Sequence, residues 1–238
     1  MLTGIVLLTF MGCLTPEAGT FQPQTESRNE DSQVRKSEDE LLRGTAKISS
    51  DVLYETIISE LHANRAEFDE AGDNYLDLAL QTKDLGILRR AIQFATINND
   101  QNALMQLALL WSEIDPLDSG PRRMLVSLTL ESGALMQSLL HMERIIELGE
   151  EIDVTLLSSK TGQIGVESRN LLISQLTILS KKFSTNTLIV MAKTQLLAQS
   201  NEFEQALEQL AALNKVIPHT PRIVLLKAEI LNRMNNPE

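Results

Sequence analysis

The chain has 238 residues, of which 43% are hydrophobic, so it can bury a sizeable core. Aromatic residues make up only 4%, and Leu, Glu, Ile and Ala are abundant, which favours an all-helical protein. The net charge of −11 argues against a nucleic-acid partner, because binding to phosphates depends on clustered Lys and Arg. The single cysteine, Cys13, excludes a disulfide framework and a metal site built from cysteines.

Residues 1–12 form an apolar run that ends in Gly12, directly before Cys13. The run is shorter than the roughly 20 residues that span a bilayer, but it has the length of a signal-peptide core. The sequence Phe10-Met11-Gly12-Cys13 resembles the lipobox of bacterial lipoproteins. The resemblance implies a signal peptide over 1–12, lipidation of Cys13, and sorting by Leu14 to the periplasmic face of the outer membrane. The alternative is an ordinary apolar N-terminus, since no Lys or Arg precedes the run.

Residues 13–50 are rich in Ser, Thr, Gln and Glu and show almost no apolar periodicity. Such a segment buries too little apolar surface to offset its loss of conformational entropy on folding. We therefore predict a disordered tether, which would hold the following part of the chain some tens of ångströms from a membrane.

Residues 51–238 change to amphipathic segments that polar breaks separate, for example at 98–100, 131–133 and 200–202. Paired helical segments that recur about every 34 residues are typical of a solenoid of the tetratricopeptide type. The sequence therefore predicts an all-α, right-handed α-solenoid of tetratricopeptide-type helical hairpins. We expect about five hairpins and an unpaired last helix.

The clearest repeat runs from Thr187 to Thr220. It resembles the tetratricopeptide motif in its small, apolar and terminal proline positions: Phe203, Ala206, Leu210, Leu213 and Pro218. Small residues at equivalent positions, which let two helices approach closely, are Ala71, Ala103 and Ser138. The step from Ser138 to Ala206 is 68 residues, or two periods of the 34-residue repeat.

Two places depart from the regular repeat. A first helix over 153–160 is short, and the sequence 161–165 interrupts it, so we expect a kink or a widened groove there. The segment from Pro221 to Met234 reads as a first helix without a partner. It is either a capping helix or the end of a shortened array, and its apolar start favours the latter or a partner that covers it.

The sequence shows no pattern that indicates catalysis. His62, His141 and His219 lie in different repeats and in no zinc-binding arrangement, and no phosphate-binding loop or nucleophile elbow occurs. We therefore expect no metal, no cofactor and no enzymatic activity. The single tryptophan, Trp111, is interpreted as a core residue between repeats, with a binding anchor as the alternative.

In tetratricopeptide arrays the first helices line a concave protein-binding surface. The resemblance assigns this role to seven residues: Leu85, Arg89, Ile92, Arg123, Ser127, Met191 and Gln195. The alternative for Arg89 and Arg123 is that they are ordinary solvated charges on helices.

The stretch from Leu53 to Trp111, with Tyr54, Tyr75 and the pair Arg89-Arg90, looks like the first repeats of the large outer-membrane tetratricopeptide lipoproteins of Gram-negative bacteria. That resemblance implies binding of other proteins, and an adaptor role for a periplasmic C-terminal processing protease that degrades cell-wall hydrolases. One alternative is a pilotin or secretin-assembly lipoprotein with the same repeats. Another is a helical enzyme with an unrecognised site.

Overall fold

A computed structural model describes residues 49–218 and 220–235. The expected signal peptide, Cys13 and almost all of the expected tether lie outside these residues. The chain divides into two units, Met1–Ser49 and Ser50–Glu238, and the helices below all belong to the second unit.

The described residues form eleven α-helices and one short 3-10 helix, with no strand among them. The helices follow one another with short connections: α2 (Ser50–Asn64), α3 (Phe68–Thr82), α4 (Leu85–Ile97), α5 (Gln101–Ile114), α6 (Gly120–Glu131), α7 (Leu135–Glu147), α8 (Leu156–Lys160), the 3-10 helix η1 (Thr161–Gln163), α9 (Val166–Lys182), α10 (Thr187–Gln199), α11 (Phe203–Val216) and α12 (Pro221–Asn235).

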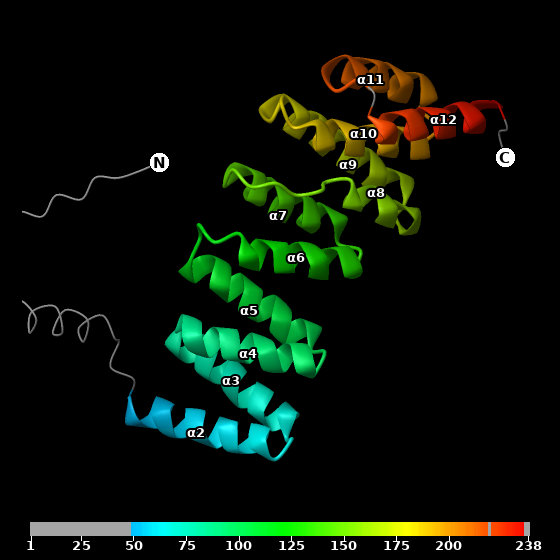
Figure 1. Cartoon of the computed structure of the whole chain (residues 1–238). Coiled ribbons are helices and arrows are strands. Elements are labelled where there is room, and N and C mark those ends of the chain that lie inside the picture. Colours follow the sequence, from blue (N-terminus) through cyan, green and yellow to red (C-terminus); the bar gives the residue numbers. More distant parts are fainter. Residues whose placement is uncertain (1–48, 219, 236–238) are drawn as a thin grey trace, which may run out of the picture. The chain divides into compact units, whose positions relative to one another are not determined.

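Consecutive helices pack against one another from α2 to α7 and again from α9 to α12 (Figure 1). Four hairpins each combine a first and a second helix: α2–α3, α4–α5, α6–α7 and α10–α11. The second helices α3 and α5 also pack against the first helices of the following repeats, α4 and α6. This arrangement confirms the predicted fold class, an all-α solenoid of tetratricopeptide-type hairpins.

The small residues that mark the repeat lie where the two helices of a hairpin meet. The four predicted positions are at most 5% exposed: Ala71, Ala103, Ser138 and Ala206. Each has a buried counterpart twelve residues earlier on the first helix: Ser59, Ala91, Val126 and Thr194. The Ser138 hydroxyl donates a hydrogen bond to the Val126 carbonyl oxygen at 3.4 Å, so the backbones approach closely there.

Polar residues fix where several helices begin and end. Asp84, Asp100 and Asn186 each accept hydrogen bonds from two backbone N–H groups in the first turn of α4, α5 and α10. These caps satisfy donors that have no partner within the helix. The predicted breaks are turns in which Asn99, Gly133 and Asn201 have positive φ angles of 53°, 75° and 61°.

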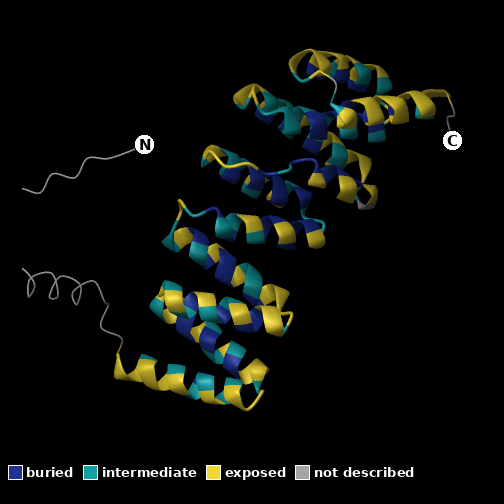
Figure 2. Ribbon diagram, in the orientation of Figure 1, coloured by how far each residue is buried: buried dark blue, intermediate teal, exposed yellow. Residues whose placement is uncertain are grey.

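Within the described residues, the core consists of three clusters of buried apolar side chains that succeed one another along the chain. The first cluster draws on α3, α4 and α5, the second extends from α6 to α10, and the third joins α10, α11 and α12. Figure 2 shows the corresponding pattern, with buried residues on the sides of the helices that face their neighbours.

The fourth repeat is irregular, as its sequence predicts. The helix α8 has only five residues and continues into η1, and the preceding residues 148–155 form a non-helical connection from α7. α8 packs against α7 and α10, while α9 packs mainly against α10. This repeat therefore presents a loop where the other repeats present a full first helix.

Candidate functional site

A surface hollow of about 490 Å³ lies where α6, α10 and α12 converge on the α7–α8 connection. Nine residues line it: Arg123, Val126, Ser127, Glu151, Ile152, Asp153, Leu156, Leu188 and Arg222. The helices that contribute are all first helices of their repeats, and we call the surface that they form the first-helix face. The hollow lies beside α8, where the sequence predicts a kink or a widened groove.

The apolar part of the hollow combines buried and exposed side chains. Val126 and Ile152 are 3% and 9% exposed, whereas Leu156 is 45% exposed. Leu188 is partly buried in the first turn of α10. An exposed leucine beside a buried apolar surface leaves apolar area that a ligand could cover.

One edge of the hollow is an ion pair between α6 and the α7–α8 connection. A terminal nitrogen of Arg123 lies 2.8 Å from the Glu150 carboxylate and donates to the Glu151 carbonyl oxygen at 2.9 Å. The Ser119 hydroxyl donates to the same Glu150 carboxylate at 2.5 Å. The hydrogen bonds from Arg123 and Ser119 hold the pKa of Glu150 below its usual value.

The opposite edge is formed by α12. Arg222 contacts the Asp153 carboxylate at 3.2 Å and donates to the Thr155 hydroxyl at 2.7 Å. Partial burial acts to raise the pKa of Asp153, but hydrogen bonds from Thr155 and Arg222 outweigh it and the pKa is lowered. Two arginines from distant helices thus hold the α7–α8 connection in place.

Two of the seven predicted contact residues, Arg123 and Ser127, line this hollow. Arg89 lies farther along the first-helix face and is exposed, with its guanidinium 5.7 Å from the centre of the Trp111 ring. Leu85 and Ile92 are partly buried, and Ile92 packs against the first core cluster. Trp111 packs against the same cluster, in agreement with its interpretation as a core residue.

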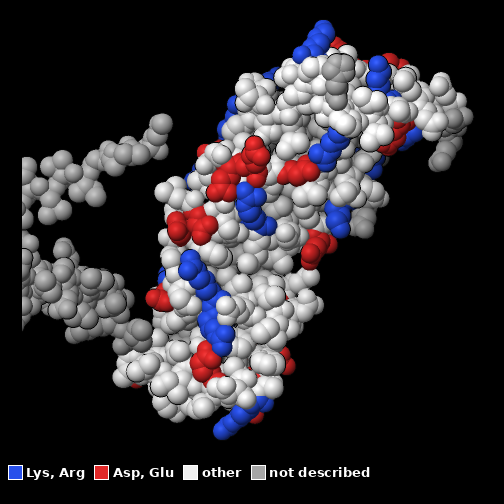
Figure 3. Space-filling view, in the orientation of Figure 1, with Lys and Arg blue, Asp and Glu red and all other residues white. Residues whose placement is uncertain are grey.

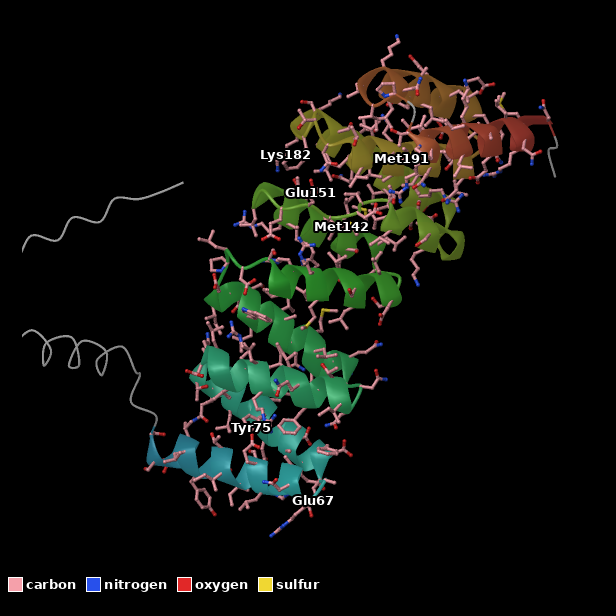
Figure 4. All side chains as sticks on the ribbon, viewed as in Figure 1. Glu67, Tyr75, Met142, Glu151, Lys182 and Met191 are labelled. Atoms are coloured by element: carbon pink, nitrogen blue, oxygen red, sulfur yellow. The ribbon has the colours of Figure 1, made fainter. Side chains whose placement is uncertain are left out.

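The prediction of Met191 as a groove contact requires correction, whereas Gln195 is partly buried. Met191 is 3% exposed and belongs to the third core cluster (Figure 4). The Gln195 side-chain oxygen accepts a hydrogen bond from the Ser158 hydroxyl at 2.7 Å, which links α10 to α8. Met191 differs from the prediction because α10 packs against α8, α9 and α11, which cover the sides that are open on α4 and α6.

Sequence reasoning missed six residues that line the hollow from α8, α10, α12 and the connection: Glu151, Ile152, Asp153, Leu156, Leu188 and Arg222. Leu188 and Arg222 are 34 residues apart, and each follows the first residue of its helix. Their shared repeat position could have identified them. The connection residues follow no repeat pattern, so no comparable signal exists for them.

The two described histidines make local contacts. His62 lies 2.6 Å from the Glu67 carboxylate, and His141 accepts a hydrogen bond from Arg122 at 3.3 Å. Burial, reinforced by Arg122, lowers the pKa of His141. His219 lies outside the described residues. Among the residues that are described, no group of three or more His, Cys, Asp or Glu side chains could hold a metal ion.

No helix within 49–218 or 220–235 combines the length and apolar character that crossing a membrane requires.

The helical hairpins, their buried small residues and the first-helix face define a helical-repeat protein of the tetratricopeptide type. No family model matches the chain. The chain is similar to a TPR repeat-containing protein of Pseudomonas aeruginosa, with 27% identity over 191 residues. The match covers 80% of this chain but only 32% of that protein, so the chain spans about a third of its relative's length.

Proposed function

We propose that this chain is a protein-binding scaffold that receives its partner on the first-helix face, at the hollow between α6 and α12. The supporting observation is the hollow itself, in which exposed Leu156 and partly buried Leu188 lie beside two charged edges of the repeat stack. The similarity to a TPR repeat-containing protein supports the same role, because solenoids commonly bind partners along such extended surfaces.

We propose that this scaffold binds without catalysing a reaction. The carboxylates of Glu150 and Asp153 are paired with arginines, and both have lowered pKa values. A general acid needs the opposite, a pKa raised toward the working pH. The ionisable groups of the hollow therefore suit recognition and positioning.

The more specific proposal is that the chain is lipidated at Cys13, faces the periplasm from the outer membrane, and acts as an adaptor for a C-terminal processing protease. It rests on the lipobox-like sequence before Cys13 and on the family resemblance of the first repeats. Incorporation of a labelled fatty acid by the native chain, and its loss in Cys13→Ala, is the expected result for the anchor.

A pull-down with matched variants tests the binding surface. The bait is the full chain, alone or with Leu156→Asp in the hollow or Leu140→Asp on α7, where Leu140 is 61% exposed. We expect a processing protease or its substrates to be retained by the native chain and by Leu140→Asp, and lost with Leu156→Asp. Equal retention by all three baits would exclude the hollow as the binding surface, and recovery of a secretin would favour the pilotin role instead.

A further inference from the structure

The charges around the hollow do not cancel. Two arginines, Arg123 and Arg222, face three carboxylates, those of Glu150, Glu151 and Asp153. Each arginine is already paired, the first with Glu150 and the second with Asp153. Among the described residues no side chain pairs with the Glu151 carboxylate, so one negative charge at the hollow is left without a counter-ion.

Glu151 is held in position although its carboxylate is free. Its backbone carbonyl oxygen accepts the hydrogen bond from Arg123 at 2.9 Å, and the next residue, Ile152, is 9% exposed and contributes to the second core cluster. Figure 4 shows Glu151 on the α7–α8 connection. An unpaired carboxylate whose backbone is held at the edge of an apolar hollow is a suitable partner for a cation that arrives with an apolar neighbour.

The net charge of the whole chain also favours a basic partner. A net charge of −11 attracts basic partners over distances of about one Debye length and raises their rate of encounter. On the side on which α6 and α12 face the viewer, acidic and basic side chains are interspersed (Figure 3). A basic segment therefore meets no large positive patch on its way to Glu151.

We propose, building on the binding function above, that the hollow selects an extended basic segment of the partner in which an apolar residue is flanked by Lys or Arg. The apolar side chain covers Leu156 and Leu188, and the flanking cation pairs with Glu151. An acidic segment would have to displace Glu150 or Asp153 from its arginine while Glu151 repels it. The geometry therefore disfavours acidic partners.

The test uses three short fluorescent peptides, measured by fluorescence anisotropy with the full chain. The first carries Lys-Leu-Lys, the second Lys-Ser-Lys and the third Glu-Leu-Glu, each within the same neutral residues. We expect the first to bind most tightly and the third about tenfold more weakly, because like charges brought together oppose binding. Added salt should weaken binding of the first peptide.

Two variants with the same change in net charge locate the interaction. Glu151→Gln should weaken binding of the Lys-Leu-Lys peptide about threefold, which is the effect expected for the loss of an exposed ion pair. Glu204→Gln, at an exposed position on α11, should have no effect. Equal weakening of peptide binding by both variants would show that only the overall negative charge of the chain attracts the peptide, and it would overturn the assignment to Glu151.

Tighter binding of the acidic peptide would also overturn the inference, as would a failure of all three peptides to bind. If no peptide binds, the pull-down described above still tests the proposed scaffold function independently. A partner that is lost with Leu156→Asp and kept with Leu140→Asp would leave the proposed function standing while the basic-segment inference falls.

Discussion

Tyr75 lies at the centre of a polar cluster that joins the first three described helices. Its hydroxyl donates to the Glu60 carboxylate at 2.7 Å, and Arg90 donates to the same carboxylate from two nitrogens at 2.7 and 2.8 Å. The Tyr75 ring stacks on Phe94 with the centroids 5.3 Å apart. Burial and the neighbouring Glu60 raise the pKa of Tyr75 to about 12.

A spectroscopic titration tests this cluster. The chain has two tyrosines, so Tyr54→Phe leaves Tyr75 as the only tyrosinate signal. We expect a midpoint of about 12 in the folded protein, against 10.0 for an unperturbed tyrosine. Because the folded pKa is the higher one, this contribution to stability is complete below pH 10 and is lost as the pH rises toward 12. A midpoint near 10 in the folded protein would contradict the Tyr75–Glu60 hydrogen bond.

Ala206 tests the close packing within a hairpin, since it is 0% exposed where α10 meets α11. Ala206→Leu should lower the free energy of unfolding by about 1–3 kcal/mol, because added methylenes force packed helices apart. Ala211→Leu places the same side chain at an exposed position of the same helix and should change stability by less than about 0.5 kcal/mol. Thermal melting followed by circular dichroism distinguishes the two, and equal effects would contradict the assigned register.

The helix caps show what a single residue contributes to an element. The Asp100 carboxylate accepts hydrogen bonds from the N–H groups of Asn102 and Ala103 at 2.9 and 3.0 Å. Asp100→Ala should therefore destabilise the protein by about 1 kcal/mol, and Asp100→Asn by much less because it keeps an acceptor. At the start of α11, Glu202 makes no capping hydrogen bond, so Glu202→Ala is the matched control. Equal melting temperatures for Asp100→Ala and Glu202→Ala would contradict the capping role.

The elements that the sequence predicts well are those with local signals. These signals are small residues at a fixed spacing, polar breaks between helices, and Pro218 after the end of α11 at Val216. Each signal concerns a single hairpin, and repeating the hairpin gives the fold. The hollow is harder to predict because its edges join residues 69 positions apart, Asp153 and Arg222. The burial of Met191 is also non-local, because it shares the third core cluster with residues of α11 and α12.

At the scale of the whole described unit, the three core clusters imply that stability is shared between neighbours. Leu107 is 0% exposed in the first cluster and Leu226 is 6% exposed in the third, and these two clusters have no helix in common. In a solenoid each repeat contacts only its neighbours, so the effect of a core mutation should fade along the stack.

Hydrogen exchange of the native protein tests this expectation with two matched truncations. Each Leu→Ala change should cost about 2–5 kcal/mol locally, because it leaves a cavity in a packed cluster. Leu107→Ala should speed exchange in α3, α4 and α5 while α11 and α12 keep their native rates, and Leu226→Ala should do the reverse. If either variant accelerates exchange equally in every helix, the array unfolds as a single cooperative unit. The short α8 would then transmit stability between repeats as effectively as a full first helix does.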